Sequence, residues 1–219
     1  MLKYPCLVLD HDDTVVRTEQ TINYPCFCQY LAQYHPGVTL TLEEYLHGCS
    51  TVGFVEMCRS RFGFTEAETA FEYRYWQDYI RGHIPDIYPG IHHLIHRFRA
   101  AGGILCVVSH SNREIIERDY LSHFGILPDA VYGWDLPAEQ RKPNPWPLLD
   151  MMKRFELAPS QLLVVDDMIP GCQMARAAGV SAGFAAWGRQ DFPNICGNME
   201  SSCDFTFRTP RDLEIFLFD

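Results

Sequence analysis

The feature of this sequence that most constrains its fold is a set of short apolar runs that do not alternate with polar residues. Six such runs occur, at residues 5–10 (PCLVLD), 104–109 (ILCVVS), 130–133 (AVYG), 161–166 (QLLVVD), 181–186 (SAGFAA) and 204–207 (DFTF). A strand that is apolar along its whole length has both faces covered, which is typical of parallel strands. The runs therefore predict a parallel sheet with a layer of helices on each face.

Amphipathic segments separate several of these runs. In residues 91–102, the apolar residues Ile91, Leu94, Ile95 and Phe98 recur at helical spacing, and Gly102 ends the segment. We expect three further helices, at residues 147–156, 171–178 and 208–219. Alternating strands and helices predict an α/β fold with a doubly wound parallel sheet of the Rossmann-like type.

One long segment breaks the alternation. Residues 17–87 contain no strand candidate, but they contain helical patterns such as 41–48 (TLEEYLHG) and 66–80. We therefore expect a Rossmann-like core formed by residues 1–16 and 88–219, with an all-helical domain inserted as residues 17–87.

Composition narrows the possible partners and compartments. A net charge of −10 without a basic run argues against binding to nucleic acid or to anionic membranes. No apolar stretch approaches the roughly 18 residues of a membrane span, and no basic region leads into an apolar segment at the N-terminus. The nine cysteines form no C-x-x-C pair, so we expect reduced thiols and a cytoplasmic protein. The oligomeric state is not predicted.

Polar residues gather where the predicted strands end, which is the edge at which parallel sheets bind ligands. The residues concerned are Asp10, Asp12, Asp13, Ser109, Asp166 and Asp167. Lys142 stands in the proline-rich loop DLPAEQRKPNPWP before the fourth run. Taken singly, each has an ordinary structural role as a turn residue, a helix cap or a solvated lysine. Together, clustered carboxylates require a cation, and oxygen ligands without histidine or cysteine favour Mg²⁺ before Ca²⁺.

In order and spacing, these residues resemble the four motifs of the haloacid dehalogenase superfamily, which consists mostly of magnesium-dependent phosphatases. The matching stretches are LVLDHDDT (Asp10, Asp12, Thr14), CVVS (Ser109), KPNP (Lys142) and VVDDMIPG (Asp166, Asp167). The helical insertion resembles the C1-type cap of phosphoglycolate phosphatases and β-phosphoglucomutases.

The resemblance implies a role for each matching residue. Asp10 is the expected nucleophile, which becomes an aspartyl phosphate, and Asp12 is the expected general acid and base. Ser109 and Lys142 are expected to bind the phosphoryl oxygens. The implied ligands of Mg²⁺ are Asp10, Asp12 through its backbone carbonyl, Asp166 and Asp167.

The sequence departs from the family pattern at three positions near the first motif. Asp13 stands where glycine is common, His11 where a hydrophobic residue is frequent, and Arg17 where an acidic residue is common. We expect His11, Arg17 and His110 on the cap side of the site, as candidate substrate contacts. Packing at the cap interface is the alternative for His11, and a surface or capping role is the alternative for His110.

The resulting prediction is a Mg²⁺-dependent phosphatase that hydrolyses a small phosphorylated metabolite. A phosphomutase of the β-phosphoglucomutase type uses the same motifs and remains an alternative. A non-catalytic phospho-accepting regulatory domain also groups aspartate, serine or threonine, and lysine on a parallel sheet. Such receiver domains are shorter and lack the helical insertion.

Overall fold

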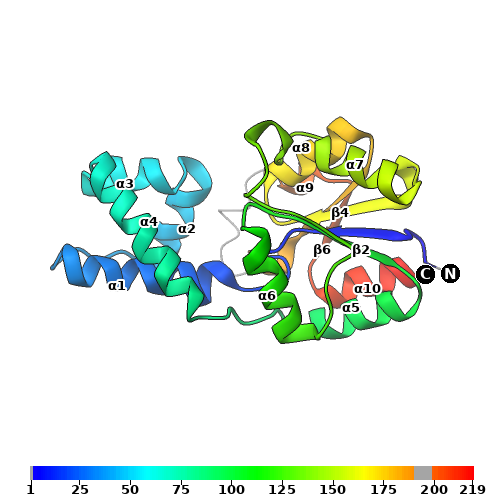
Figure 1. Ribbon diagram of the computed structural model, residues 1–219, viewed down its shortest axis with the longest axis horizontal. Helices are drawn as coiled ribbons and strands as arrows, with labels where there is room; N and C mark the ends of the chain where they lie inside the picture. The colour runs from blue at the N-terminus through cyan, green and yellow to red at the C-terminus, as the bar shows by residue number, and fades with distance from the viewer. Residues whose placement is uncertain (1, 190–198) are drawn as a thin grey trace. The chain divides into compact units, whose positions relative to one another are not determined.

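The structure, a computed structural model, describes residues 2–189 and 199–219 and contains a six-stranded parallel sheet (Figure 1). Its strands are β1 (Cys6–Leu9), β2 (Ile104–Val108), β3 (Ala130–Tyr132), β4 (Leu162–Asp166), β5 (Ser181–Ala185) and β6 (Phe205–Phe207). The strand order is β3-β2-β1-β4-β5-β6, and every neighbouring pair is parallel. All six apolar runs therefore form strands, and β1, which is buried along its whole length, lies in the interior of the sheet.

Helices cover both faces of this sheet (Figure 1). They are α5 (Ile91–Ala100), α6 (Arg113–Phe124), α7 (Trp146–Phe155), α8 (Ile169–Ala178), α9 (Met199–Ser202) and α10 (Pro210–Phe218). Leu7 and Leu9 of β1 pack into one buried cluster with α5, α6 and α10, whereas Cys6 and Val8 pack into a second cluster with α7 and α8. Successive residues of a strand point to opposite faces, so one apolar strand supplies both clusters. The predicted doubly wound fold is confirmed.

The chain divides into two compact units. One comprises the described residues of Met1–Val16 and Ile87–Asp219, and the other is Arg17–Asp86. Within its described residues the second unit is entirely helical, with a π-helical turn (Glu19–Asn23) followed by α1 (Tyr24–Tyr34), α2 (Leu42–Thr51), α3 (Phe54–Phe62) and α4 (Glu66–Arg81). Capping boxes begin α2 at Thr41 and α4 at Thr65.

Both ends of the helical insertion are tied by backbone contacts. In the sheet-bearing unit, Val16 and Ile87 form an antiparallel bridge, and the Tyr88 N–H donates to the Val15 carbonyl at 3.2 Å. In the helical unit, the Arg17 N–H donates to the Asp86 carbonyl at 2.7 Å. The chain therefore leaves the sheet-bearing unit after Val16 and returns to it at Ile87, two residues that are paired in space.

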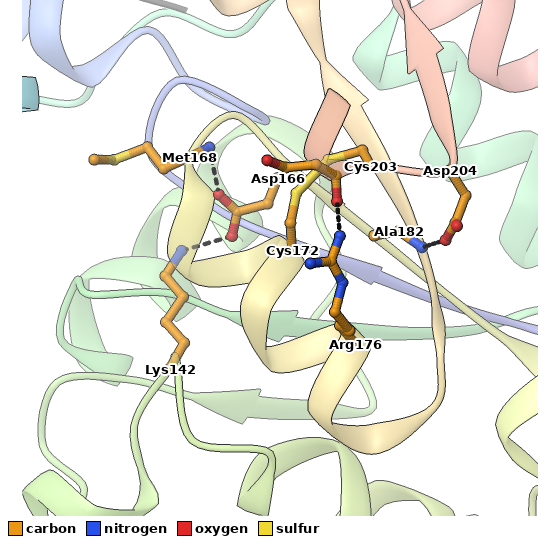
Figure 2. Close-up of a disulfide and its surroundings, with 9 residues drawn as sticks. Lys142, Asp166, Met168, Cys172, Arg176, Ala182, Cys203 and Asp204 are labelled. Carbon is orange, nitrogen blue, oxygen red and sulfur yellow. Dashed lines mark hydrogen bonds and ion pairs between the residues drawn. A yellow bond between two sulfur atoms is a disulfide. The ribbon is translucent and has the colours of Figure 1, made fainter. Parts of the chain in front are cut away.

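A disulfide joins Cys172 of α8 to Cys203, which directly follows α9 (Figure 2). The two Cα atoms are 5.9 Å apart, although 31 positions separate the residues in the sequence. The expectation of reduced thiols throughout is therefore wrong for this pair, because tertiary packing joins two cysteines that sequence spacing does not link. Six other cysteines are free, and Cys196 lies outside the described residues.

No helix of residues 2–189 and 199–219 is both long enough and apolar enough to cross a membrane.

Candidate active site

Three buried aspartates meet at the carboxyl ends of two neighbouring strands. Asp10 follows β1, Asp166 ends β4, and Asp167 comes next; we refer to these three residues as the aspartate cluster. The Asp10 N–H donates to the Val165 carbonyl at 2.9 Å, which extends the β1–β4 pairing up to the cluster. One carboxylate oxygen of each aspartate lies within 4.8 Å of those of the other two. Strand pairing thus holds three carboxyl groups together in a buried place.

Lys142 bridges two members of the aspartate cluster. Its Nζ donates to Asp10 Oδ1 and to Asp166 Oδ2, both at 2.8 Å, and only 5% of the residue is exposed. Figure 2 shows the second of these contacts, together with the hydrogen bond from the Met168 N–H to Asp166 Oδ1 at 2.8 Å. The lysine of the proline-rich loop is therefore a buried cation of the site, not a solvated surface residue.

The contact between Lys142 and Asp10 shifts the pKa of both residues. Burial acts to lower the pKa of Lys142, but the carboxylates of Asp10 and Asp166 outweigh it and raise that pKa. Burial likewise acts to raise the pKa of Asp10, but the charge and hydrogen bond of Lys142 hold it below the usual value. Lys142 is therefore protonated and Asp10 ionised near neutral pH.

Asp167 is the cluster member best suited to hold a cation. Its Oδ2 accepts a hydrogen bond from Arg189 Nη2 at 2.6 Å, whereas the buried Oδ1 has no hydrogen-bond partner among the described residues. Burial raises the pKa of Asp167 to about 8, with Arg189 lowering it and the other two aspartates raising it further. An added cation would stabilise the ionised form. The all-oxygen cluster therefore fits a site for a divalent metal ion.

Close packing of α8 leaves little space around Asp166. A β-carbon added to Gly171 in the first turn of α8 would lie 2.1 Å from Asp166 Oδ2. A side chain at Gly171 would therefore force the carboxylate, and Lys142 with it, to move.

Asp12 lies near the end of β1 but outside the aspartate cluster, and two serines hold its side chain. Its Oδ2 accepts hydrogen bonds from Ser109 Oγ at 3.2 Å and from Ser111 Oγ at 2.6 Å. The Ser111 N–H also donates to Ser109 Oγ at 3.2 Å, which ties the loop after β2 together. Ser111 was not among the expected site residues. The sequence SHS at the end of β2, with a second serine two positions after Ser109, is the signal that could have identified it.

The three candidate substrate contacts have different surroundings. His11 is buried, and its Nε2 lies 3.1 Å from Asp119 Oδ2 of α6, a core position that does not fit a substrate contact. His110 Nε2 lies 3.0 Å from the Lys142 carbonyl oxygen. Arg17 belongs to the helical unit, where its Nη2 donates to Gln20 Oε1 at 2.6 Å.

Arg189 is the second site residue that sequence reasoning missed. Its Nη1 lies 2.9 Å from Asp13 Oδ2, and its Nη2 lies 2.6 Å from Asp167 Oδ2. It belongs to none of the four motifs and follows β5, so only the folded chain brings it to the site.

Known proteins are similar to this chain in sequence and in fold. Over 122 residues it is 31% identical to the phosphoglycolate phosphatase of Nitrosospira multiformis, an alignment that covers 53% of this chain and 50% of that protein. The chain thus spans about half the length of the curated relatives it matches. Over 93 residues it is 31% identical to a bifunctional riboflavin kinase/FMN phosphatase of Arabidopsis thaliana, covering 42% of this chain and 24% of that one.

Solved structures share the whole fold at lower identity. A haloacid dehalogenase-like protein of unknown function from Agrobacterium tumefaciens superposes with a TM-score of 0.77 at 18% identity, covering 97% of this chain and 96% of that one. CbbY from Rhodobacter sphaeroides, crystallised with phosphate, gives a TM-score of 0.68 at 18% identity, with coverage of 97% and 96%. Residues 7–185 match the family model of the haloacid dehalogenase-like hydrolases, and this chain belongs to that family.

Proposed function

We propose that this protein is a Mg²⁺-dependent phosphatase that hydrolyses a small phosphorylated metabolite through an aspartyl phosphate on Asp10. The observation that carries the proposal is the position of Lys142, whose Nζ lies 2.8 Å from both Asp10 and Asp166 inside a buried carboxylate cluster. A cation there keeps Asp10 ionised and can attract an incoming phosphoryl group. The four relatives named phosphoglycolate phosphatase support the reaction class and make phosphoglycolate the first substrate to test.

In the proposed first step, a carboxylate oxygen of Asp10 attacks phosphorus, forming an acyl phosphate as the phosphorus–oxygen ester bond breaks. Asp12 donates its proton to the leaving oxygen. In the second step, Asp12 takes a proton from a water molecule that attacks the same phosphorus. Inorganic phosphate leaves, and the Asp10 carboxylate is restored.

The other polar residues position these groups. The short hydrogen bond from Ser111 at 2.6 Å orients the Asp12 carboxyl, which leaves the Ser109 hydroxyl, at 3.2 Å, as the group that turns to a phosphoryl oxygen. A Mg²⁺ ion held by the aspartate cluster and by the Asp12 backbone carbonyl would neutralise charge on the transferring phosphoryl group.

The first test separates the two aspartates of the first motif. With an aryl phosphate and Mg²⁺, the leaving group needs little protonation, but water still needs a base in the second step. We therefore expect Asp12→Ala to accumulate about one covalent phosphate per chain, by the acyl-phosphate mechanism. Asp10→Asn should accumulate none. Intact-protein mass spectrometry after an acid quench, which preserves acyl phosphates, measures both.

Three other outcomes have distinct meanings. Labelling of Asp10→Asn would place the nucleophile elsewhere. If neither variant is labelled while the wild type turns over, direct attack by water becomes the better mechanism. Transfer of phosphate to a second hydroxyl of a sugar phosphate, in place of release, would identify a phosphomutase.

The second test concerns the metal. We expect excess chelator to abolish turnover and Mg²⁺ to restore it, with Ca²⁺ a poor substitute because it accepts looser, higher coordination. Unchanged turnover in excess chelator would contradict the metal assignment. A screen of phosphorylated metabolites with Mg²⁺ present, beginning with phosphoglycolate, then identifies the substrate.

A further inference from the structure

Asp13 occupies a backbone conformation that favours glycine. Its φ is +54°, in the left-handed region, where a side chain costs roughly 1–2 kcal/mol of conformational energy. The residue is also buried, so a carboxylate there must be compensated. Aspartate is tolerated in this region more readily than most residues, so the backbone permits it without requiring it. The buried carboxylate is what points to a contact made by its side chain.

That contact is with Arg189. The guanidinium donates from Nη1 to Asp13 Oδ2 at 2.9 Å and from Nη2 to Asp167 Oδ2 at 2.6 Å, and the residue is only 8% exposed. One buried side chain therefore joins the loop after β1 to the end of β4. A planar guanidinium suits this bridge because its donors have fixed directions.

The two residues before Arg189, Trp187 and Gly188, pack against the loop that follows β1. A β-carbon on Gly188 would lie 2.2 Å from the Asp13 carbonyl oxygen, so the two segments approach as closely as glycine allows. Trp187 Nε1 donates to the Thr14 carbonyl at 2.9 Å, a buried hydrogen bond. The segment after β5 is thus anchored at two consecutive residues before Arg189 reaches the carboxylates.

Arg189 has two opposing effects on a cation held by Asp167. Its positive charge repels the cation and would weaken binding. Its hydrogen bond also fixes the carboxylate, occupying Oδ2 and leaving Oδ1 as the buried oxygen without a hydrogen-bond partner among the described residues. Partners that orient metal ligands typically contribute about 10-fold to 100-fold in affinity. The sign of the net effect distinguishes repulsion from positioning.

We propose that Arg189 and Asp13 form a positioning pair that holds Asp167 with Oδ1 presented to the metal. Asp13 fixes the guanidinium, and the guanidinium fixes Asp167. The inference rests on the proposed function only in requiring that the aspartate cluster binds a divalent cation. It assigns a role to the Asp13 departure from the family pattern, because the same carboxylate that replaces glycine is the anchor of Arg189.

Direct metal titration without substrate tests the proposal. Binding of Mn²⁺ by electron paramagnetic resonance and of Mg²⁺ by calorimetry would be compared in the wild type, Arg189→Gln, Arg189→Lys and Asp13→Gly. We expect Arg189→Gln to weaken binding by about 10-fold or more and Arg189→Lys to recover part of the loss. Asp13→Gly, which removes the anchor but suits the backbone, should weaken binding by a smaller factor. The double variant of Arg189→Gln with Asp13→Gly should bind no worse than Arg189→Gln alone, because the two residues act in series.

Arg176→Gln is the matched control, since it changes net charge equally at an exposed arginine of α8. Tighter binding in Arg189→Gln would mean that its charge dominates, and unchanged binding would mean that it does not position Asp167; either result overturns the inference. If Arg189→Gln fails to fold by circular dichroism, Asp13→Gly carries the test, and unaltered affinity in it overturns the pair. Absence of binding in the wild type would instead contradict the metal site itself.

Discussion

Buried carboxylates are handled differently in the two units of the chain. In the sheet-bearing unit, each member of the aspartate cluster lies within 2.8 Å of a cation, either Lys142 or Arg189. In the helical unit, Glu72 of α4 is only 5% exposed, and no described residue forms a hydrogen bond or an ion pair with it. One unit therefore surrounds its buried acids with positive charge, and the other leaves its buried acid alone.

The difference appears at Asp10 and not across the whole cluster, because burial also raises the pKa of Asp166 to about 6 and that of Asp167 to about 8. Lys142 holds the pKa of Asp10 down despite burial, whereas burial alone raises the pKa of Glu72 to about 7. Around Glu72, burial also raises the pKa of the Cys26 and Cys58 thiols to about 12, with a further contribution from Glu72 itself. The sheet-bearing unit thus keeps one buried carboxylate, that of Asp10, ionised. The core of the helical unit favours neutral side chains.

Breaking the charge compensation at Lys142 should have the largest effect. We expect Lys142→Ala to lose on the order of 10² or more in turnover, since it removes a strong transition-state contact. It should also cost on the order of 3 kcal/mol in the free energy of unfolding, because it leaves buried carboxylates unpaired. Turnover of an aryl phosphate and urea denaturation measure the two losses.

Arg141→Ala is the control for Lys142. The Arg141 guanidinium lies over the Trp134 ring, 4.1 Å from its centroid, and its Nε donates to the Leu136 carbonyl at 2.5 Å. It contacts no member of the aspartate cluster among its described contacts, so we expect little loss of turnover. Equal losses in the two variants would show that the wrong cation has been assigned to the site.

Glu72 should make the stability of the helical unit depend on pH, in the sense opposite to the effect of Asp10, whose pKa is lowered. Its pKa is 4.5 in the unfolded chain and about 7 in the folded one, so the folded state binds the proton more tightly. The contribution of Glu72 to the free energy of unfolding is therefore fully present below pH 4.5, its pKa in the unfolded chain. It is lost as the pH rises through about 7, its pKa in the folded chain. We expect the contribution of Glu72 to the free energy of unfolding to fall by about 2–3 kcal/mol between about pH 5 and about pH 8.

Glu72→Gln should make the fall smaller by that amount in denaturant titrations across the same pH range, while Asp167, whose pKa is also raised, still contributes a fall of the same sign. Glu66→Gln, an exposed glutamate in the first turn of the same helix, is the matched control and should leave the fall unchanged. If the fall in Glu72→Gln equals that of the wild type, Glu72 does not contribute, and the contrast between Asp10 and Glu72 disappears.

The smallest expected effect comes from breaking the capping box at the start of α4 in the helical unit. At the start of α4, Thr65 Oγ1 accepts from the Glu68 N–H at 3.2 Å, and the Glu68 carboxylate accepts from the Thr65 N–H at 2.8 Å. We expect Thr65→Ala to cost about 1 kcal/mol in thermal unfolding without altering metal affinity. Thr51→Ala, at the end of α2, removes an exposed threonine that caps no helix start and should cost less. A change in metal affinity for Thr65→Ala would argue against a purely local role.

The sequence predicts most of the sheet because β1, β4 and their neighbours are apolar along their whole length. It does not single out α6, whose buried face includes Asp119 and Tyr120 beside Ile116 and so lacks a clean apolar stripe. Asp119 is buried there because His11 and Arg118 contact its carboxylate, a pairing across 108 positions in the case of His11. A helix whose buried face depends on a tertiary partner is not visible in local spacing.

In the candidate site, too, some residues can be predicted from the sequence and others depend on tertiary contacts. The aspartate cluster and Lys142 come together as expected, because residues at the carboxyl ends of adjacent parallel strands meet at one edge. The contact of Arg189 with Asp167 and the disulfide between Cys172 and Cys203 could not be predicted. Arg189 and Cys203 each belong to a segment that only the folded chain brings to its partner, and neither lies in a recognisable motif.

The backbone closure at Val16 and Ile87 has a consequence for how such proteins diversify. Because these residues pair with each other, and the Tyr88 N–H with the Val15 carbonyl, the insertion leaves from the stem of what is in effect a very long hairpin. The entropic cost of closing a loop grows only slowly with its length. The same stem can therefore carry a longer, shorter or unrelated insertion while the strand ends keep their register. Recombination at the two ends of the segment that encodes Arg17–Asp86 would replace the helical unit as a cassette and leave the strand ends that carry the aspartate cluster in place.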